Sequence, residues 1–303
     1  MRVNVIGACN IDITALAGGT VRMHDSNPAT VRYTHGGVGR NIAHNCSLLG
    51  LSPRFVSAVG RGPQGEAILS ELRDAGCDVS GVIVSDEYPT GSYISFIDEN
   101  GDLLVAANSM VINELIVPGT VSDLDAEDAV TAFDTNIPEE TIDAVTSLGG
   151  IKYAEPVSGP KCVKLLPYLS RIDIIKPNVY EAAELCKTDT SCEDGIIRAG
   201  MILREKGVKK VFITESVRGA WLFSGEERIH FVPETVEAVS ANGAGDAFSS
   251  GIIYGTARGL GDMEILRFSC AAAACALEHT GAVNMSISEK YVLKKAGLLK
   301  NEQ

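Results

Sequence analysis

Short apolar segments alternate with helical patterns through most of the chain, and this alternation limits the folds open to it. Five segments have the composition of buried strands, at residues 3–6, 55–59, 129–134, 172–176 and 210–214. Strands that alternate with helices favour an α/β fold with a mostly parallel sheet covered on both faces. The chain has 303 residues, of which 45% are hydrophobic, so it is long enough to bury a sizeable core.

The alternation lapses twice, at about residues 12–35 and 88–112. In the second lapse, residues 93–97 and 103–105 flank an Asn100-Gly101 turn, which is typical of a β-hairpin. We expect the two segments to form a small sheet, a lid that projects from a single domain spanning residues 1–303. Such a lid would cover a substrate or bury its edge against a second copy, so we expect a homodimer through the lid.

Composition excludes several classes of protein. A net charge of −13 argues against a general nucleic-acid binder, and no apolar run reaches the ~20 residues that a membrane span needs. The eight cysteines include no CxxC pair and follow no secretory leader, which indicates reduced thiols and a cytoplasmic protein, and the five scattered histidines argue against zinc. An anionic ligand must therefore be held locally, by helix N-termini and by a few cations such as Arg40, Lys161, Lys176 and Arg218.

The stretch Ser240-Ala241-Asn242-Gly243-Ala244-Gly245-Asp246 places three small residues directly before a carboxylate. A helical pattern follows, with Ala247, Phe248, Gly251, Ile252 and Gly255 on one face. Small residues let backbone N–H groups approach a phosphate closely, and a helix start adds unpaired donors. Asp246 would then lie in the first turn, beside a transferring phosphoryl group. The alternative is an ordinary turn with an acidic residue that suits a helix start.

A second glycine cluster, Gly36-Gly37-Val38-Gly39-Arg40-Asn41, opens another helical pattern, through Ile42, Cys46 and Leu49. Two such clusters favour anion binding over ordinary turns. The second cluster is not a dinucleotide fingerprint, because residues 31–35 are too polar for a buried first strand and the third glycine is missing. The Walker A pattern is absent as well, which excludes an ordinary P-loop enzyme.

Polar residues directly follow two of the predicted strands, at the edge where open α/β sheets bind ligands. Asn10 and Asp12 follow the first strand, and a carboxylate there can accept hydrogen bonds from two adjacent sugar hydroxyls. The alternative is that Asp12 is a capping or turn residue. Asn178 and Glu181 follow residues 172–176 and share a helix face, where their oxygens suit Mg²⁺ or its waters. The alternative for this pair is a capping box.

In this order, the elements resemble the ribokinase-like carbohydrate kinases, or PfkB family, over essentially the whole chain, and the two glycine clusters match that family's paired signatures. The resemblance implies a three-layer α/β/α fold with a mostly parallel central sheet and a β-sheet lid, and ATP and Mg²⁺ as cofactors. Asp246 matches the catalytic base that takes the proton from the acceptor hydroxyl. Gly243, Ala244 and Gly245 match the anion hole for the phosphoryl group.

Within the family, the likeness is most detailed to members that phosphorylate the 5′-hydroxyl of pseudouridine. It is carried by residues 25–28 (Asp-Ser-Asn-Pro), 36–41, 156–158 and 161–164. The resemblance places seven residues around the ribose: Asn10, Asp12, Gly36, Gly37, Gly39, Asn41 and Asn136. It places Asn178, Thr214, Gly219 and Asn242 around the nucleotide, and the base under the lid. Asn27 and lid residues near Ser92 or Asn108 are candidates for reading the base.

The chain departs from the family pattern in three places. Ser240 and Ala241 stand where the second signature usually has Asp and Thr, and since that Asp commonly helps to hold a monovalent cation, a K⁺ requirement is left open. Residues 60–65 lack the Asp of a frequent Gly-x-Asp-x-x-Gly motif, and Glu155 replaces the Asp of a common Asp-Pro pair. None of these departures removes the base or the anion hole.

Two other functions stay open. A ribokinase-like kinase for another acceptor, such as ribose, uridine or adenosine, would share these motifs. A nucleoside-binding regulator that has lost catalysis would share the fold, although Asp246 and the glycines before it argue against that reading.

Overall fold

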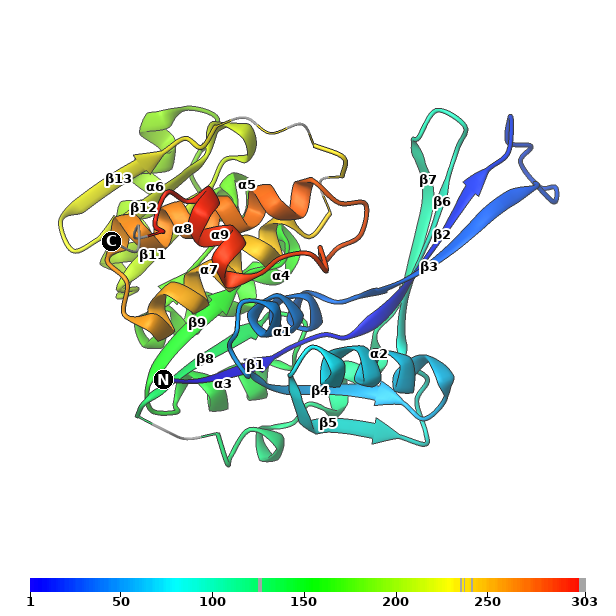
Figure 1. Cartoon of the computed structure of the whole chain (residues 1–303), viewed down its shortest axis with the longest axis horizontal. Coiled ribbons are helices and arrows are strands. Elements are labelled where there is room, and N and C mark those ends of the chain that lie inside the picture. The colour runs from blue at the N-terminus through cyan, green and yellow to red at the C-terminus, as the bar shows by residue number, and fades with distance from the viewer. Residues whose placement is uncertain (125–126, 235, 237, 241, 300–303) are drawn as a thin grey trace.

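The expected α/β architecture is present in the computed structural model, which describes residues 1–124, 127–234, 236, 238–240 and 242–299. Among these residues, nine strands form one large sheet (Figure 1). Their spatial order is β13 (Glu227–Phe231), β12 (Ala220–Ser224), β11 (Lys210–Thr214), β10 (Ile174–Ile175), β9 (Ile151–Glu155), β8 (Ala129–Asp134), β1 (Arg2–Ile6), β4 (Arg54–Gly60) and β5 (Asp78–Ser85). All neighbours from β11 to β5 are parallel, and β12 and β13 add an antiparallel edge.

The predicted strand at residues 172–176 was too long. Only β10, with its two residues, belongs to the ladder. Asp173 lies just outside the ladder, although its backbone N–H donates to the carbonyl of Lys152 at 3.0 Å, and its carboxylate also accepts a hydrogen bond from the backbone N–H of Lys152 at 2.7 Å. By contrast, β8 and β11 begin and end at the predicted residues.

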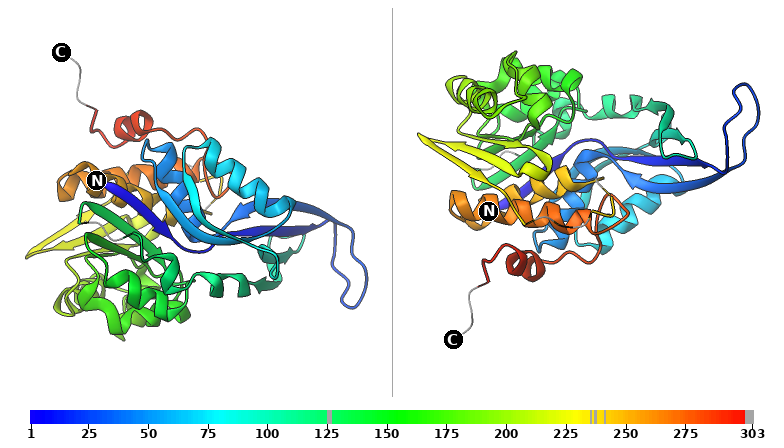
Figure 2. Two further views of the ribbon diagram at one scale, coloured as in Figure 1. Left: turned by 90° about the horizontal axis from the view of Figure 1, so that it is seen from below. Right: turned by 90° about the horizontal axis from the view of Figure 1, so that it is seen from above.

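Helices cover both faces of the large sheet (Figure 2). One layer contains α1 (Val38–Leu48), α2 (Pro63–Asp74), α7 (Ala244–Arg258), α8 (Asp262–Leu277) and α9 (Glu289–Lys295). The other contains α3 (Glu139–Thr146), α4 (Gly159–Cys162), α5 (Val179–Cys186), α6 (Glu193–Glu205) and the 3₁₀ helix η3 (Val163–Arg171). Each layer packs on its own buried apolar cluster, so the sheet lies between two cores.

The lid is a second, four-stranded sheet that projects from the side of the body (Figure 1). Its strand order is β3 (Ala29–Gly36), β2 (Asn10–Ala17), β6 (Gly91–Ile97) and β7 (Leu103–Ser109). The two lapses in the sequence pattern thus pair with each other, through the parallel strands β2 and β6, and the Asn-Gly hairpin is formed by β6 and β7. Within the described part of the chain, no helix is both long and apolar enough to cross a membrane.

The glycines of α7 allow α8 to pack very close to it. A Cβ atom on Gly251 would lie 2.6 Å from the Cα of Ser269, and one on Gly255 would lie 2.7 Å from Cγ1 of Ile265. Separations below 3.0 Å do not occur between such atoms without movement. The small residues on the predicted face of this helix therefore fix the distance between the two helices, and with it the position of the α7 N-terminus.

Gly251→Ala tests this close packing. Alanine favours a helix over glycine by about 1 kcal/mol, but here its methyl group meets the backbone of α8, so we expect the free energy of unfolding to fall by about 1–3 kcal/mol. Gly159→Ala in α4 is the matched control, because the nearest atom to its added Cβ is 4.0 Å away. Urea unfolding of both variants gives the comparison, and equal stability of the two would contradict the packing argument.

Candidate active site

The two glycine clusters, far apart in the sequence, meet at the N-termini of α1 and α7. The amide Nδ2 of Asn41 donates a hydrogen bond to Oδ2 of Asp246 at 2.8 Å, across 205 residues of chain. Asp246 lies in the first turn of α7, as the sequence pattern predicts. This bond joins the two clusters into one site.

The start of α7 offers backbone donors to a ligand. Gly243 is the N-cap, with φ +78° and no side-chain capping bond, and Ala244 and Gly245 are the first helical residues. A side chain cannot replace the hydrogen of Gly243, because a Cβ there would lie 1.8 Å from the carbonyl oxygen of Ala282. An uncapped helix start bordered by small residues suits an anion.

The electrostatics around Asp246 suit a base that works near neutral pH. Burial raises the pKa of Asp246 to about 7. The Asn41 hydrogen bond lowers it, nearby Glu155 raises it, Lys176 lowers it and Asp134 raises it further. The residue as a whole is half-buried, and the carboxylate itself lies in a buried environment. A carboxylate with this pKa can accept a proton in the physiological range.

A buried ion pair lies behind the first turn of α7. The ammonium of Lys176 lies 3.1 Å from Oε1 of Glu155, and it also donates to the carbonyl of Gly245 at 3.5 Å. Ser249 and Tyr153 donate to the other oxygen of Glu155, at 2.6 and 3.1 Å. Burial alone would lower the pKa of Lys176, but the carboxylates around it raise the pKa above its usual value. Sequence reasoning noted Glu155 only as a departure from a family motif and missed this role.

The proposed sugar end of the site lies where the lid joins the body. Asn10 pairs with Gly36 at the base of the lid, and its Nδ2 donates to Oδ1 of Asp12 at 2.6 Å. A Cβ on Gly36 would lie 2.4 Å from Oδ2 of Asp12, so glycine makes room for this carboxylate. Burial raises the pKa of Asp12. The structure thus brings these three predicted residues together.

A buried carboxylate that sequence reasoning missed holds the first cluster in place. Oδ2 of Asp134 accepts hydrogen bonds from the backbone N–H groups of Ala8 and Gly39, both at 2.9 Å. A Cβ on Gly39 would lie 2.7 Å from the Cα of Gly7, and Gly37 adopts φ +97°. The available signal was an acidic residue at the end of an apolar strand, at the ligand-binding edge of the sheet.

Of two further predicted substrate residues, Asn136 stays at the site and Asn27 lies further out. The backbone N–H of Asn136 donates to Oδ1 of Asp134 at 2.8 Å. The side-chain oxygen of Asn136 accepts a hydrogen bond from Lys161 at 2.5 Å. Asn27 lies in the loop between β2 and β3, where its side chain bonds to backbone groups of Arg22 and Asp25. At roughly 3.3 Å per residue, that loop begins about 23 Å along β2 from Asn10. In this conformation Asn27 organises the outer loop of the lid.

Three of the four predicted nucleotide residues lie together at the ends of β10 and β11. Asn178 and Thr214 form an isolated parallel bridge, and Gly219 follows the short helix η4 (Ser216–Arg218) with φ +85°. A Cβ on Gly219 would lie 2.0 Å from the carbonyl oxygen of Phe231, so the turn requires glycine. Asn242 is exposed, and its N–H donates to Oγ of Ser240 at 3.2 Å. Ala241, between them, lies outside the described residues.

Asn178 and Glu181 form the capping box of α5. The contacts of this pair are therefore those of the capping box that the sequence offered as the alternative to a Mg²⁺ site. Each donates its backbone N–H to the other's side-chain oxygen, at 2.9 Å. Within the described residues, no group of three or more His, Cys, Asp or Glu could hold a metal ion. Only one oxygen of Glu181 serves the cap, so this carboxylate fits an outer contact to Mg²⁺ held mainly by nucleotide phosphates and waters.

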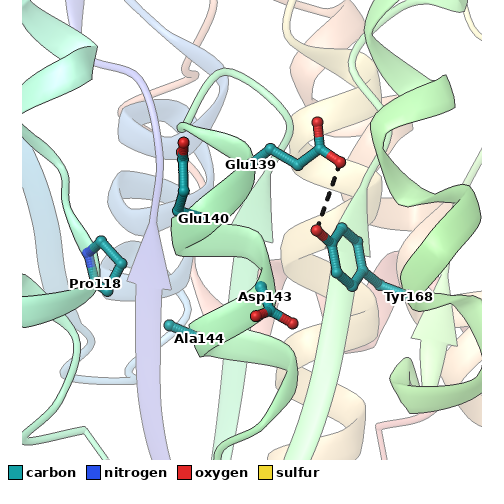
Figure 3. A pocket seen from close by; sticks show the side chains of 6 residues that line it. All are labelled: Pro118, Glu139, Glu140, Asp143, Ala144 and Tyr168. Carbon is teal, nitrogen blue, oxygen red and sulfur yellow. Dashed lines mark hydrogen bonds between the residues drawn. The ribbon is translucent and has the colours of Figure 1, made fainter.

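A hollow elsewhere on the surface does not belong to this site (Figure 3). It lies over α3 and η3, in the helix layer opposite α1 and α7. Its carboxylates, from Glu139, Glu140 and Asp143, would repel the phosphates of a nucleotide. The groups that suit an anionic ligand therefore lie at the N-termini of α1 and α7, and not in this hollow.

Asp246→Asn should stabilise the protein above neutral pH. Because the pKa of Asp246 is higher in the folded protein than in the unfolded chain, folding takes up a proton between about pH 4 and pH 7, and stability falls as the pH rises through that window. We expect the variant to raise the free energy of unfolding by about 1–3 kcal/mol at pH 8 and to change it little at pH 4. Asp74→Asn, at the exposed end of α2, is the control for the substitution itself. Thermal or urea unfolding of both variants at the two pH values gives the comparison. A gain no larger at pH 8 than at pH 4 would contradict the raised pKa.

Comparison with known proteins gives the family. Residues 2–290 match the pfkB family of carbohydrate kinases. A pseudouridine kinase of Escherichia coli K12 is 30% identical over 293 residues, which cover 94% of this chain and 93% of that protein. A ribokinase of Haemophilus influenzae is 25% identical, over 82% of each chain.

Solved structures agree with this assignment. A carbohydrate kinase from Agrobacterium tumefaciens superposes with a TM-score of 0.86 at 28% identity, over 99% of this chain and 98% of that one. The Arabidopsis thaliana ribokinase solved with ribose and ATP gives a TM-score of 0.85 at 24% identity, over 97% and 98%. The chain therefore belongs to the pfkB family of carbohydrate kinases, phosphotransferases that act on a hydroxyl of a sugar or nucleoside.

Proposed function

We propose that this protein transfers the γ-phosphoryl group of ATP, with Mg²⁺, to the 5′-hydroxyl of pseudouridine. The observation that carries the proposal is the position of Asp246 in the first turn of α7, with a pKa raised to about 7, beside an uncapped helix start. The likeness over nearly the whole chain to the E. coli pseudouridine kinase supports the choice of acceptor.

In the proposed mechanism, the 5′-oxygen of the nucleoside forms a bond to the γ-phosphorus while the bond from the γ-phosphorus to ADP breaks. Asp246 accepts the proton that the 5′-hydroxyl loses. The N–H groups that follow Gly243 stabilise the charge on the phosphoryl oxygens. Asn10 and Asp12 hold the ribose hydroxyls, which aligns the 5′-oxygen for in-line attack. Most of the rate enhancement then comes from alignment and from preorganised dipoles.

The nucleotide would lie along the ends of β10 and β11, against Asn178, Thr214 and Gly219. Mg²⁺, when bound, would neutralise charge on the β- and γ-phosphates. Lys176 contributes a fixed positive charge behind the same helix start, paired with Glu155. We also propose a cytoplasmic location, which the eight free cysteines support.

The lid is the proposed site of base recognition and of dimer formation. Ser92 pairs with Ile11, next to Asp12, so it lies closer to the sugar end than Asn27 does. β7 is an edge strand, and all of its residues are exposed. An exposed edge of this kind can be completed by the lid of a second copy.

The acceptor is tested by measuring kcat/KM for pseudouridine, uridine, adenosine and ribose with ATP and Mg²⁺. We expect pseudouridine to be preferred, and Asp246→Asn to lower kcat by roughly 10²- to 10⁴-fold because it removes the proton acceptor. Ribose is included because a ribokinase is among the relatives. A preference for another acceptor would overturn the substrate, and near-normal turnover of Asp246→Asn would overturn the base.

The reader of the base is tested with Asn27→Ala and Ser92→Ala. Pseudouridine carries an N1–H donor that uridine lacks, and losing the buried acceptor for it should reduce the pseudouridine-to-uridine preference by at least about tenfold. The measurement is the ratio of kcat/KM values for the two nucleosides. An unchanged ratio in Asn27→Ala would exclude Asn27 as the residue that reads the base. An unchanged ratio in Ser92→Ala would exclude Ser92 in the same way.

A further inference from the structure

Behind Asn41 lies a buried cation that the mechanism has not used. Arg40 is only 2% exposed, although its neighbour in the sequence contacts the proposed base. One guanidinium nitrogen donates to Oδ1 of Asn41 at 2.9 Å, and the other lies 2.5 Å from Oε1 of Glu71 on α2. A continuous chain of bonds therefore runs from Glu71 through Arg40 and Asn41 to Asp246.

We propose that Arg40, held by Glu71, is a positioning residue that fixes the orientation of the Asn41 amide toward Asp246. The inference rests on the proposed role of Asp246 as the base. Arg40 itself does not touch the reacting atoms.

The chemistry of the amide explains why a cation is needed there. The oxygen and nitrogen ends of an asparagine side chain have nearly the same shape, so packing alone does not choose between them. A guanidinium has only donors, so the Asn41 oxygen must face Arg40 and its NH₂ must face Asp246. In the flipped amide, the oxygen would face the carboxylate and would favour its protonated form, which cannot accept a proton.

Groups from three elements surround Arg40. Oε2 of Glu71, on α2, forms a hydrogen bond with Nδ1 of His35, from the lid strand β3. Nδ1 of His44, on α1, lies 3.3 Å from Oε1 of Glu71. Burial alone would raise the pKa of Glu71, but the His35 hydrogen bond and the charge of Arg40 lower it to about 2. Burial and Arg40 lower the pKa of His44 to about 4. Near neutral pH, Glu71 is therefore a fixed anion that holds Arg40.

The groups that face Asp246 come from four other places in the fold. They are Asn41 on α1, Asp134 on β8, Glu155 on β9 and Lys176 after β10. Arg40→Met leaves all four in place and removes the group that orients Asn41, but it also removes a charge that lowers the pKa of Asp12. Glu71→Gln keeps that charge, so an upward shift of the acidic limb in both variants reports the orientation of the amide and not the titration of Asp12.

The test is the pH dependence of kcat and of kcat/KM for pseudouridine, at saturating ATP and Mg²⁺, in Arg40→Met, Arg40→Lys and Glu71→Gln. We expect Arg40→Met to lower kcat roughly 10- to 100-fold at pH 7 and to move the acidic limb of the profile upward by about one pH unit. Arg40→Lys keeps the charge and should recover part of both effects. Arg73→Met and Glu66→Gln are matched controls, since this pair on α2 is exposed, and neither should change the profile.

Each outcome decides the inference. If Arg40→Met is folded but keeps the wild-type kcat and acidic limb, Arg40 is only structural and the inference is wrong. If Arg40→Met does not fold, Glu71→Gln and Arg40→Lys provide the test. A smaller upward shift of the acidic limb in these variants supports the inference, and no shift contradicts it. Asp246→Asn separates this result from the proposed function: if it is inactive while the Arg40 and Glu71 variants are normal, only the inference fails, whereas an active Asp246→Asn overturns the base itself.

Discussion

The arrangement of the site depends on one buried carboxylate, Asp134. Its Oδ2 accepts N–H groups from two segments of chain, the loop after β1 and the first turn of α1, and it does so where their backbones nearly touch. A buried anion without such donors would be very costly, so these hydrogen bonds hold the loop after β1 and the first turn of α1 against the end of β8. The position of α1 fixes Asn41, and Asn41 meets α7. Asp134, at the end of β8, therefore helps to set the geometry at the proposed base on α7, through α1 and Asn41.

Charge balance is the second constraint on the site. Three carboxylates, from Glu155, Glu181 and Asp246, lie around the single ammonium of Lys176, before any phosphate arrives. Burial is the largest cause that raises the pKa values of Glu181 and Asp246, and the neighbouring Glu155 raises both further, since one cation cannot fully offset three nearby anions. The charge imbalance costs stability at the proposed base, and such a cost is a common feature of functional sites.

The sequence predicted the parts of this protein that are governed by local patterns. The layered fold, the limits of β8 and β11, the start of α7 and the Asn-Gly hairpin all follow from hydrophobic periodicity and glycine placement. Strand β5 was missed because it is half-exposed and interrupted by Ser and Gly, and β13 was missed because it is half-exposed and polar. Asp134, Glu155 and the Arg40–Glu71 pair were missed because their partners come from distant segments, which a single sequence does not reveal. For Asn178 and Glu181, local pattern alone could not separate a cap from a metal ligand.

The parallel pairing of β2 with β6 has a consequence for how such a protein can be altered. A parallel pair cannot be closed by a tight turn, so the chain must leave the lid between the two hairpins and return. Here it passes through α1, β4, α2 and β5, and the two strands β4 and β5 belong to the large sheet. The lid therefore cannot be exchanged as a separate segment. Recombination or grafting that replaces it must replace the whole chain from β2 to β7, including part of the body. A change of lid in a protein of this design brings with it the helix that holds Glu71.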